Sequence, residues 1–155
     1  MGPIAENIKL FFERVNPEKI ITIENLPKSG GDRIYFRITT KENSYIATYN
    51  ENLRESATFL YFTDHFLKIN APVPEIYFVS DDAKIYIQQD FGAISLLNEL
   101  EKHGQNDYVY DLFKKSLKAL SFLQIKGIKD LDDSYCLTSK DFGKQAVMSD
   151  LLYFK

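Results

Sequence analysis

The residues with the clearest chemical use form a short turn, Ser29, Gly30, Gly31 and Asp32, between two stretches of β-strand character. Glycines leave main-chain N–H groups free to point at phosphate oxygens, while the flanking strands hold a nucleotide. The same glycines suit an ordinary hairpin turn that needs a positive φ. This pattern alone therefore leaves a phosphate loop and a plain hairpin equally open.

Two arginines, Arg33 and Arg37, follow the turn on an alternating stretch and share one face of it. The opposite face carries Ile34, Phe36 and Ile38. A guanidinium beside a phosphate loop can meet phosphate charge. An arginine on the solvent face of a strand, however, needs no function at all.

The tripeptide Asp-Phe-Gly, which is the magnesium motif of protein kinases, occurs twice, at 90–92 and at 141–143. That motif works only downstream of a catalytic loop that supplies a base and a second metal ligand. The first copy follows a strand too early in the chain, and no His-Arg-Asp or His-Gly-Asp precedes the second. We predict that neither copy binds metal, and we assign no catalytic role to His65 or His103.

Composition narrows the class of protein. The chain has 155 residues, of which 45% are hydrophobic and 26% charged, enough for one domain with a real core. A net charge of −3 argues against sequence-independent nucleic-acid binding. No apolar run exceeds four residues, and Cys136 is the single cysteine, so neither a membrane span nor an internal disulfide is expected. These features predict a cytoplasmic protein with no nucleic-acid or membrane partner.

Hydrophobic periodicity predicts the elements that position these residues. Strands are expected over 19–26, 33–38, 45–49, 75–79 and 84–89. Helices are expected over 4–15, 52–70, 94–102 and 108–126, the last two closed by Gly104 and Gly127. Short connections make the first three strands antiparallel. The predicted fold class is α+β, with a five-stranded antiparallel sheet and a long helix, followed by further helices.

A further helix is expected after Ala146, with Val147, Leu151 and Phe154 on an apolar stripe that runs to the last residue, Lys155. Such a stripe needs a partner. We therefore expect a second domain that is cut near its beginning, and the stripe is a candidate surface for self-association. The expected organisation is an N-terminal helix over 1–18, a sheet lobe over 19–91 and a helical start over 92–155.

An ordered set of short motifs carries a resemblance to a known family. The motifs are 29–37, Ile46-Ala47-Thr48-Tyr49, Arg54-Glu55, His65-Phe66, Val73-Pro74-Glu75-Ile76, Asp90-Phe91-Gly92 and Asp141-Phe142. From Leu26 onward they resemble the aminoglycoside phosphotransferase superfamily, which is protein-kinase-like, and within it predicted bacterial amino-sugar kinases. The resemblance implies a kinase-like N-lobe followed by the first helices of a C-lobe.

The resemblance also implies an activity. The full-length parent would transfer the γ-phosphate of ATP or GTP, with Mg²⁺, to a hydroxyl of a sugar or amino sugar. In the family the base and the metal-binding carboxylates come from the large lobe, so this chain alone is expected to be inactive. The turn at 29–32 would cover the nucleotide phosphates. Glu55 would face the active site, an orientation that its spacing from Phe59 favours, although it could equally cap an exposed helix edge.

A hinge that holds adenine through its main chain would comprise Gln88, Gln89, Asp90 and Phe91. One position departs from the family pattern. Protein kinases place a lysine on the third strand against the helix glutamate, and the motif alignment puts Tyr49 in that place. We favour Arg33 or Arg37 as the compensating cation.

The missing lysine also allows a second hypothesis, in which the chain is a non-catalytic interaction module that retains the kinase-like scaffold. Titration with Mg²⁺–ATP while following thermal stability distinguishes the two, because a ligand that binds the folded form stabilises it.

Overall fold

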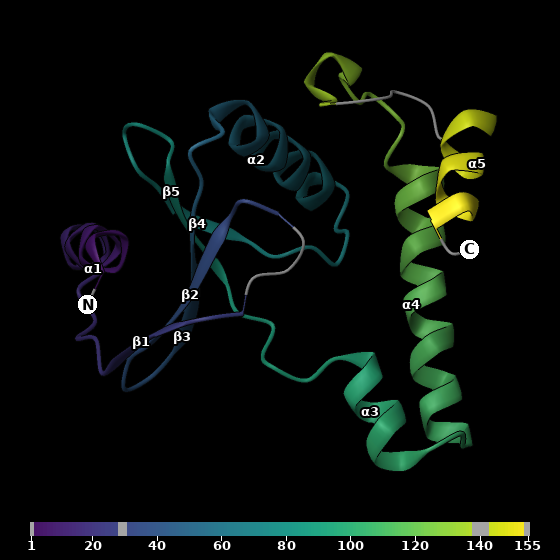
Figure 1. Ribbon diagram of the computed structural model, residues 1–155, viewed down its shortest axis with the longest axis horizontal. Helices are drawn as coiled ribbons and strands as arrows, with labels where there is room; N and C mark the ends of the chain where they lie inside the picture. Colours follow the sequence, from purple (N-terminus) through teal and green to yellow (C-terminus); the bar gives the residue numbers. More distant parts are fainter. Residues whose placement is uncertain (1, 28–30, 138–142, 154–155) are drawn as a thin grey trace.

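A five-stranded antiparallel sheet with strand order β1-β2-β3-β5-β4 forms the centre of the first half of the molecule (Figure 1). The computed structural model describes residues 2–27, 31–137 and 143–153. The strands are β1 (Thr22–Asn25), β2 (Ile34–Thr39), β3 (Ser44–Tyr49), β4 (Ile76–Val79) and β5 (Ile85–Gln89). The predicted α+β class and the antiparallel sheet are confirmed. The first strand is shorter than expected, although hydrogen bonds from the Ile21 and Leu26 N–H groups to β2 continue the pairing at each end.

Five α-helices and a short 3₁₀-helix complete the described structure. They are α1 (Pro3–Val15), α2 (Leu53–Lys68), α3 (Leu96–His103), α4 (Asp107–Lys126), η1 (Asp133–Tyr135) and α5 (Lys144–Tyr153). Polar side chains cap three of the helix starts: Asn52 begins α2, Ser95 begins α3 in a capping box, and Asn106 begins α4. Helix α5 begins earlier than the expected start after Ala146.

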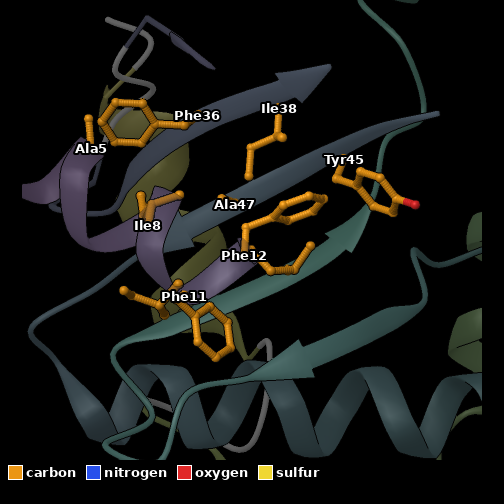
Figure 2. Packing of buried hydrophobic residues seen from close by; sticks show 10 residues of the cluster. Ala5, Ile8, Phe11, Phe12, Phe36, Ile38, Tyr45 and Ala47 are labelled. Carbon is orange, nitrogen blue, oxygen red and sulfur yellow. The ribbon is translucent and has the colours of Figure 1, made fainter. Parts of the chain in front are cut away.

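Helix α1 covers one face of the sheet and forms the main hydrophobic core with it. Pro3 suits the first turn of this helix, and Ile8 and Phe12 are fully buried. The cluster comprises Ala5, Ile8, Phe11, Phe12, Phe36, Ile38, Tyr45, Ala47, Ile85 and Ile87 (Figure 2). Because side chains alternate along a strand, this packing directs the neighbouring residues of β2, β3 and β5 to the opposite face.

Helix α2 lies against that opposite face of the sheet (Figure 1). The ring of Phe59 stacks on the fully buried ring of Tyr86, with 5.2 Å between the ring centroids and 25° between the planes. Ser56 and Thr63 of α2 are also buried. The helix therefore presents both aromatic and polar side chains to the sheet.

Helices α3, α4 and α5 lie beside the sheet and form what we call the helical half; α1, α2 and the sheet form the sheet half (Figure 1). Gly104 ends α3 with a φ of 66°, as a closing glycine does. Large apolar side chains remain exposed along α4, among them Phe113, Leu117, Leu120 and Ile125. Within the described ranges, no helix has both the length and the apolar character that a membrane crossing requires.

Gly127 ends α4 as expected, but for a different physical reason. Its φ of −70° lies in the right-handed region, so the position does not need a left-handed backbone. A methyl group there would lie 2.4 Å from the Leu123 carbonyl oxygen and 2.7 Å from the ring of Phe66. Close approach to α2 is therefore what requires glycine.

Candidate functional site

An ion pair between Arg33 and Glu55 joins the entry of β2 to the first turn of α2. The distance from Arg33 Nη2 to Glu55 Oε1 is 2.8 Å, and the two side chains are 27% and 22% exposed. Asn50 Nδ2 donates to the other carboxylate oxygen of Glu55 at 3.2 Å. The Arg33 guanidinium also lies 5.6 Å from the ring centroid of Phe59. The structure thus brings together two of the residues predicted from the sequence.

Charge and burial both act on this arginine. Partial burial lowers the pKa of Arg33, but the Tyr86 hydroxyl, Tyr35 and Glu55 raise it, and the net pKa shift is upward. The guanidinium therefore stays charged over the working pH range of proteins, as a group that holds phosphate must.

The second predicted arginine, Arg37, has a different partner. Its guanidinium donates to both carboxylate oxygens of Asp90, at 2.7 and 3.0 Å, and the Asp90 side chain is only 3% exposed. Asp90 also accepts from the Ser44 hydroxyl and from the Gly92 N–H, each at 2.8 Å. Burial raises the pKa of Asp90, but these donors outweigh it and the net pKa shift is downward. Asp90 is therefore a fixed anchor at the start of the linker that leaves β5.

The motif alignment puts Tyr49 in the place of the third-strand lysine of protein kinases, but Tyr49 does not lie on the face of the sheet that carries Glu55. Tyr49 packs with the α1 cluster and its hydroxyl donates to Glu51, on the face of the sheet opposite to Glu55. Thr48, like Ile46, lies on the face of β3 that is directed to α2; Thr48 is fully buried and lies opposite Tyr86 in the sheet. A motif alignment does not include the pairing of strands, so it does not identify the face of β3 on which Tyr49 lies.

Of the predicted phosphate turn, Ser29 and Gly30 lie outside the described residues. Gly31 and Asp32 are exposed. A methyl group at Gly31 would meet open space, and the residue does not need a positive φ. The protein's own packing therefore does not explain this glycine.

The predicted hinge residues separate into two groups. Gln89 stays in the sheet, where its N–H donates to the Glu75 carbonyl at 2.8 Å and its side-chain oxygen accepts from the Glu75 N–H at 3.3 Å. Phe91 follows the anchor residue Asp90 and is 62% exposed. The end of β5 is thus held by Glu75, just before β4, and the next residue, Asp90, is held by Arg37.

Sequence reasoning missed a polar layer between the sheet and α2. Four buried side-chain atoms of the described part have no hydrogen bond of good geometry: Thr48 Oγ1, Ser56 Oγ, Tyr86 OH and Gln88 Oε1. Burial raises the pKa of Tyr86, while the nearby Arg33 and Thr48 lower it in part. Period-two alternation in β5, which puts Tyr86 and Gln88 on one face, is the signal that could have found this layer.

In the ranges with assigned structure, no group of three or more His, Cys, Asp or Glu side chains gathers closely enough to hold a metal ion. Asp90 is the carboxylate of the first Asp-Phe-Gly copy, and its oxygens are occupied by Arg37, Ser44 and Gly92. The second copy begins at residues outside the described part.

A surface hollow of about 600 Å³ lies elsewhere, between α1 and the turn that joins β4 to β5. Arg14 and Asp81 meet at its rim at 3.4 Å, and both are largely exposed. This hollow is on the α1 side of the sheet and is separate from the Arg33–Glu55 pair.

No protein-family model and no curated protein sequence matches the chain.

Proposed function

We propose that this chain is the nucleotide-binding part of a phosphotransferase that moves the γ-phosphate of ATP or GTP to a hydroxyl of a sugar or amino sugar. The observation that supports this most is the Arg33–Glu55 ion pair at 2.8 Å. Protein kinases hold phosphates with a lysine paired to a helix glutamate. Here a cation from the neighbouring strand pairs with the glutamate of α2, directly after the glycine turn.

Each residue has a defined role in this proposal. Main-chain N–H groups of Gly31 and Asp32 contact the phosphates, and Arg33 donates to a phosphate oxygen. Glu55, held by Arg33 and Asn50, fixes the direction of the guanidinium. Mg²⁺ would shield the charge of the phosphates when bound.

The element order also supports a kinase-like N-lobe: three strands, α2, two more strands, then helices. The proposal includes binding without turnover, because the sequence has no His-Arg-Asp or His-Gly-Asp loop to supply a base. The sugar acceptor belongs to the proposed full-length parent.

Calorimetric titration with Mg²⁺–ATP and Mg²⁺–GTP tests the proposal. We expect Arg33→Ala to weaken binding about tenfold or more, because a charge-assisted hydrogen bond to phosphate is lost. Arg33→Lys should keep part of the affinity as a point charge. Arg14→Ala, on the α1 side, is the matched control and should bind like the wild type. Equal affinity of wild type and Arg33→Ala would contradict the proposed site.

The second candidate is a non-catalytic interaction module, and the exposed apolar side chains of α4 favour it. This candidate predicts no binding of either nucleotide by the wild-type chain. The same titration therefore decides between them.

A further inference from the structure

The segment that follows α4 turns back towards α2 (Figure 1) and is bonded to its outer surface. We call residues 127–135 the strap. His65 Nε2 donates to the Gly127 carbonyl at 2.7 Å, and the Tyr61 hydroxyl accepts from the Asp132 N–H at 2.6 Å. The Thr58 hydroxyl donates to the carbonyl of the last strap residue at 2.7 Å. Three hydrogen bonds thus span residues 58–65 of the helix.

Aromatic packing adds to these bonds. The rings of Tyr61 and Tyr135 are stacked, with 4.1 Å between centroids and 11° between planes. At the other end of the strap, Gly127 lies so close to Phe66 that a methyl group would be 2.7 Å from the ring. The strap is therefore fitted to α2 along its length.

The inner surface of α2 is held differently. Phe59 stacks on Tyr86, but the surrounding layer contains the buried hydroxyls of Thr48 and Ser56, which lack hydrogen bonds of good geometry. Buried polar groups without partners weaken an interface. On the other face of the sheet, α1 instead buries Ile8 and Phe12 in a continuous apolar cluster. Helix α2 therefore depends more on its outer contacts than α1 does.

We propose that the strap positions α2, and through Glu55 the guanidinium of Arg33, so that the segment after α4 controls ligand binding in the sheet half. Tyr135 is the main positioning residue, since its ring and its carbonyl both contact α2. The link to ligand binding rests on the proposed function. The mechanical link between the strap and α2 does not.

Hydrogen exchange of the full chain tests the mechanical link. In Tyr135→Ala, we expect amides of α2, including the turn that carries Glu55, to exchange about fivefold faster, as loss of one stacked ring pair predicts. Tyr135→Phe keeps the ring and should restore wild-type exchange. Tyr110→Ala, an exposed tyrosine of α4 that contacts Lys114, is the matched control. Unchanged α2 exchange in Tyr135→Ala, or an equal increase in α1, would overturn the proposal.

A second variant covers the case in which Tyr135→Ala does not fold. Tyr61→Phe keeps the ring stack but removes the acceptor for the Asp132 N–H, and it should loosen α2 in the same direction. Mg²⁺–ATP titration then tests the ligand link, with affinity expected to fall about fivefold in Tyr135→Ala and to return in Tyr135→Phe. Full affinity with a loosened α2 would refute that link. If the wild type binds no nucleotide, the proposed function fails, while the exchange result still decides the role of the strap.

Discussion

Arg33 and Arg37 point to the same side of the sheet but have different uses, because they lie near opposite ends of one strand. Arg33 meets the first turn of α2 and keeps 27% of its side chain exposed, so it can reach a ligand. Arg37 meets the linker after β5 and donates to a carboxylate that is only 3% exposed. Of the two cations favoured from the sequence, the geometry therefore favours Arg33 for phosphate and Arg37 for structure.

Replacing Arg37 should destabilise the fold. Arg37→Ala leaves the buried Asp90 carboxylate with the Ser44 and Gly92 donors alone, and we expect a loss of about 2 kcal/mol in the free energy of unfolding. Urea denaturation measures this loss. Arg14→Ala, which breaks an exposed pair at 3.4 Å, should change stability by less than about 0.5 kcal/mol. Similar losses of stability in Arg37→Ala and Arg14→Ala would show that the buried Arg37–Asp90 pair stabilises the fold no more than the exposed Arg14–Asp81 pair does.

Asp90 should also make stability depend on pH. Its pKa is lowered in the folded state, so its ionised form stabilises the fold above the unfolded pKa, and that contribution is lost as pH falls through the folded pKa. We therefore expect Asp90→Asn to be less stable than the wild type at about pH 7, and the difference to shrink towards about pH 3. Urea denaturation across this range checks the trend. If the stability difference between the wild type and Asp90→Asn stays constant over this pH range, carboxylates other than Asp90 cause the loss of stability in acid.

Among the elements, α2 is the one whose two surfaces carry the proposed functions: Glu55 faces the sheet and Tyr61 faces the strap. Its asparagine cap at Asn52 fixes where the helix begins and hence which residues fall on each surface. A change on the outer surface can therefore affect the inner one without touching a ligand.

Gly127, at the end of α4, lies close to Phe66 of α2, and a substitution there measures how tightly these two helices pack. Gly127→Ala should destabilise the chain by about 2 kcal/mol, because the new methyl group would overlap the Phe66 ring and the Leu123 carbonyl. Gly31→Ala, in open space without a positive φ, is the matched control and should be nearly neutral. Thermal unfolding measures both. In the double variant with Phe66→Ala, the effect of the new methyl should be smaller, since part of the overlap is removed.

The order and type of the elements could be predicted because each has a local signal: alternation in β2, helical spacing in α1, an Asn or Ser before each capped helix. It was harder to predict which residues contact each other across the sheet. Arg37 and Asp90 are 53 positions apart in sequence, so their pairing depends on the sheet order and not on any local motif. The same holds for Tyr49, whose face is set by the pairing of β3 with its neighbours. The reason for glycine at 127 depends on a helix far away in the chain.

At the scale of the whole molecule, the helical half leaves many large apolar side chains exposed, whereas the sheet half buries a cluster of them around α1. Leu117 on α4 is 61% exposed, and Leu151 and Leu152 on α5 are 62% and 65% exposed. Exposed apolar patches of this kind favour association. The chain is thus divided into a half with its own core and a half that needs further contacts.

We expect the chain to self-associate as its concentration rises, through the apolar side chains of α5 and α4. Sedimentation velocity over a concentration series measures this. The double substitution Leu151→Lys and Leu152→Lys should shift the distribution towards monomer, because charges oppose burial of that surface. Leu10→Lys, an exposed leucine of α1, is the control and should leave association unchanged. Monomer at every concentration would show that this surface does not bind a second copy.

The hydrogen bonds that fix Asp90 determine about which residues the helical half can rotate relative to the sheet half. Three hydrogen bonds, two from Arg37 and one from Ser44, tie its carboxylate to β2 and β3, and Ser95 is fixed in turn by its own capping box. Between these points lie the exposed Phe91, Gly92 with a φ of 91°, and the exposed residues 93–94. Rotation of the helical half about the sheet would therefore be concentrated in this four-residue pivot, residues 91–94. Shortening or stiffening the pivot would limit the range of that rotation while leaving both halves intact.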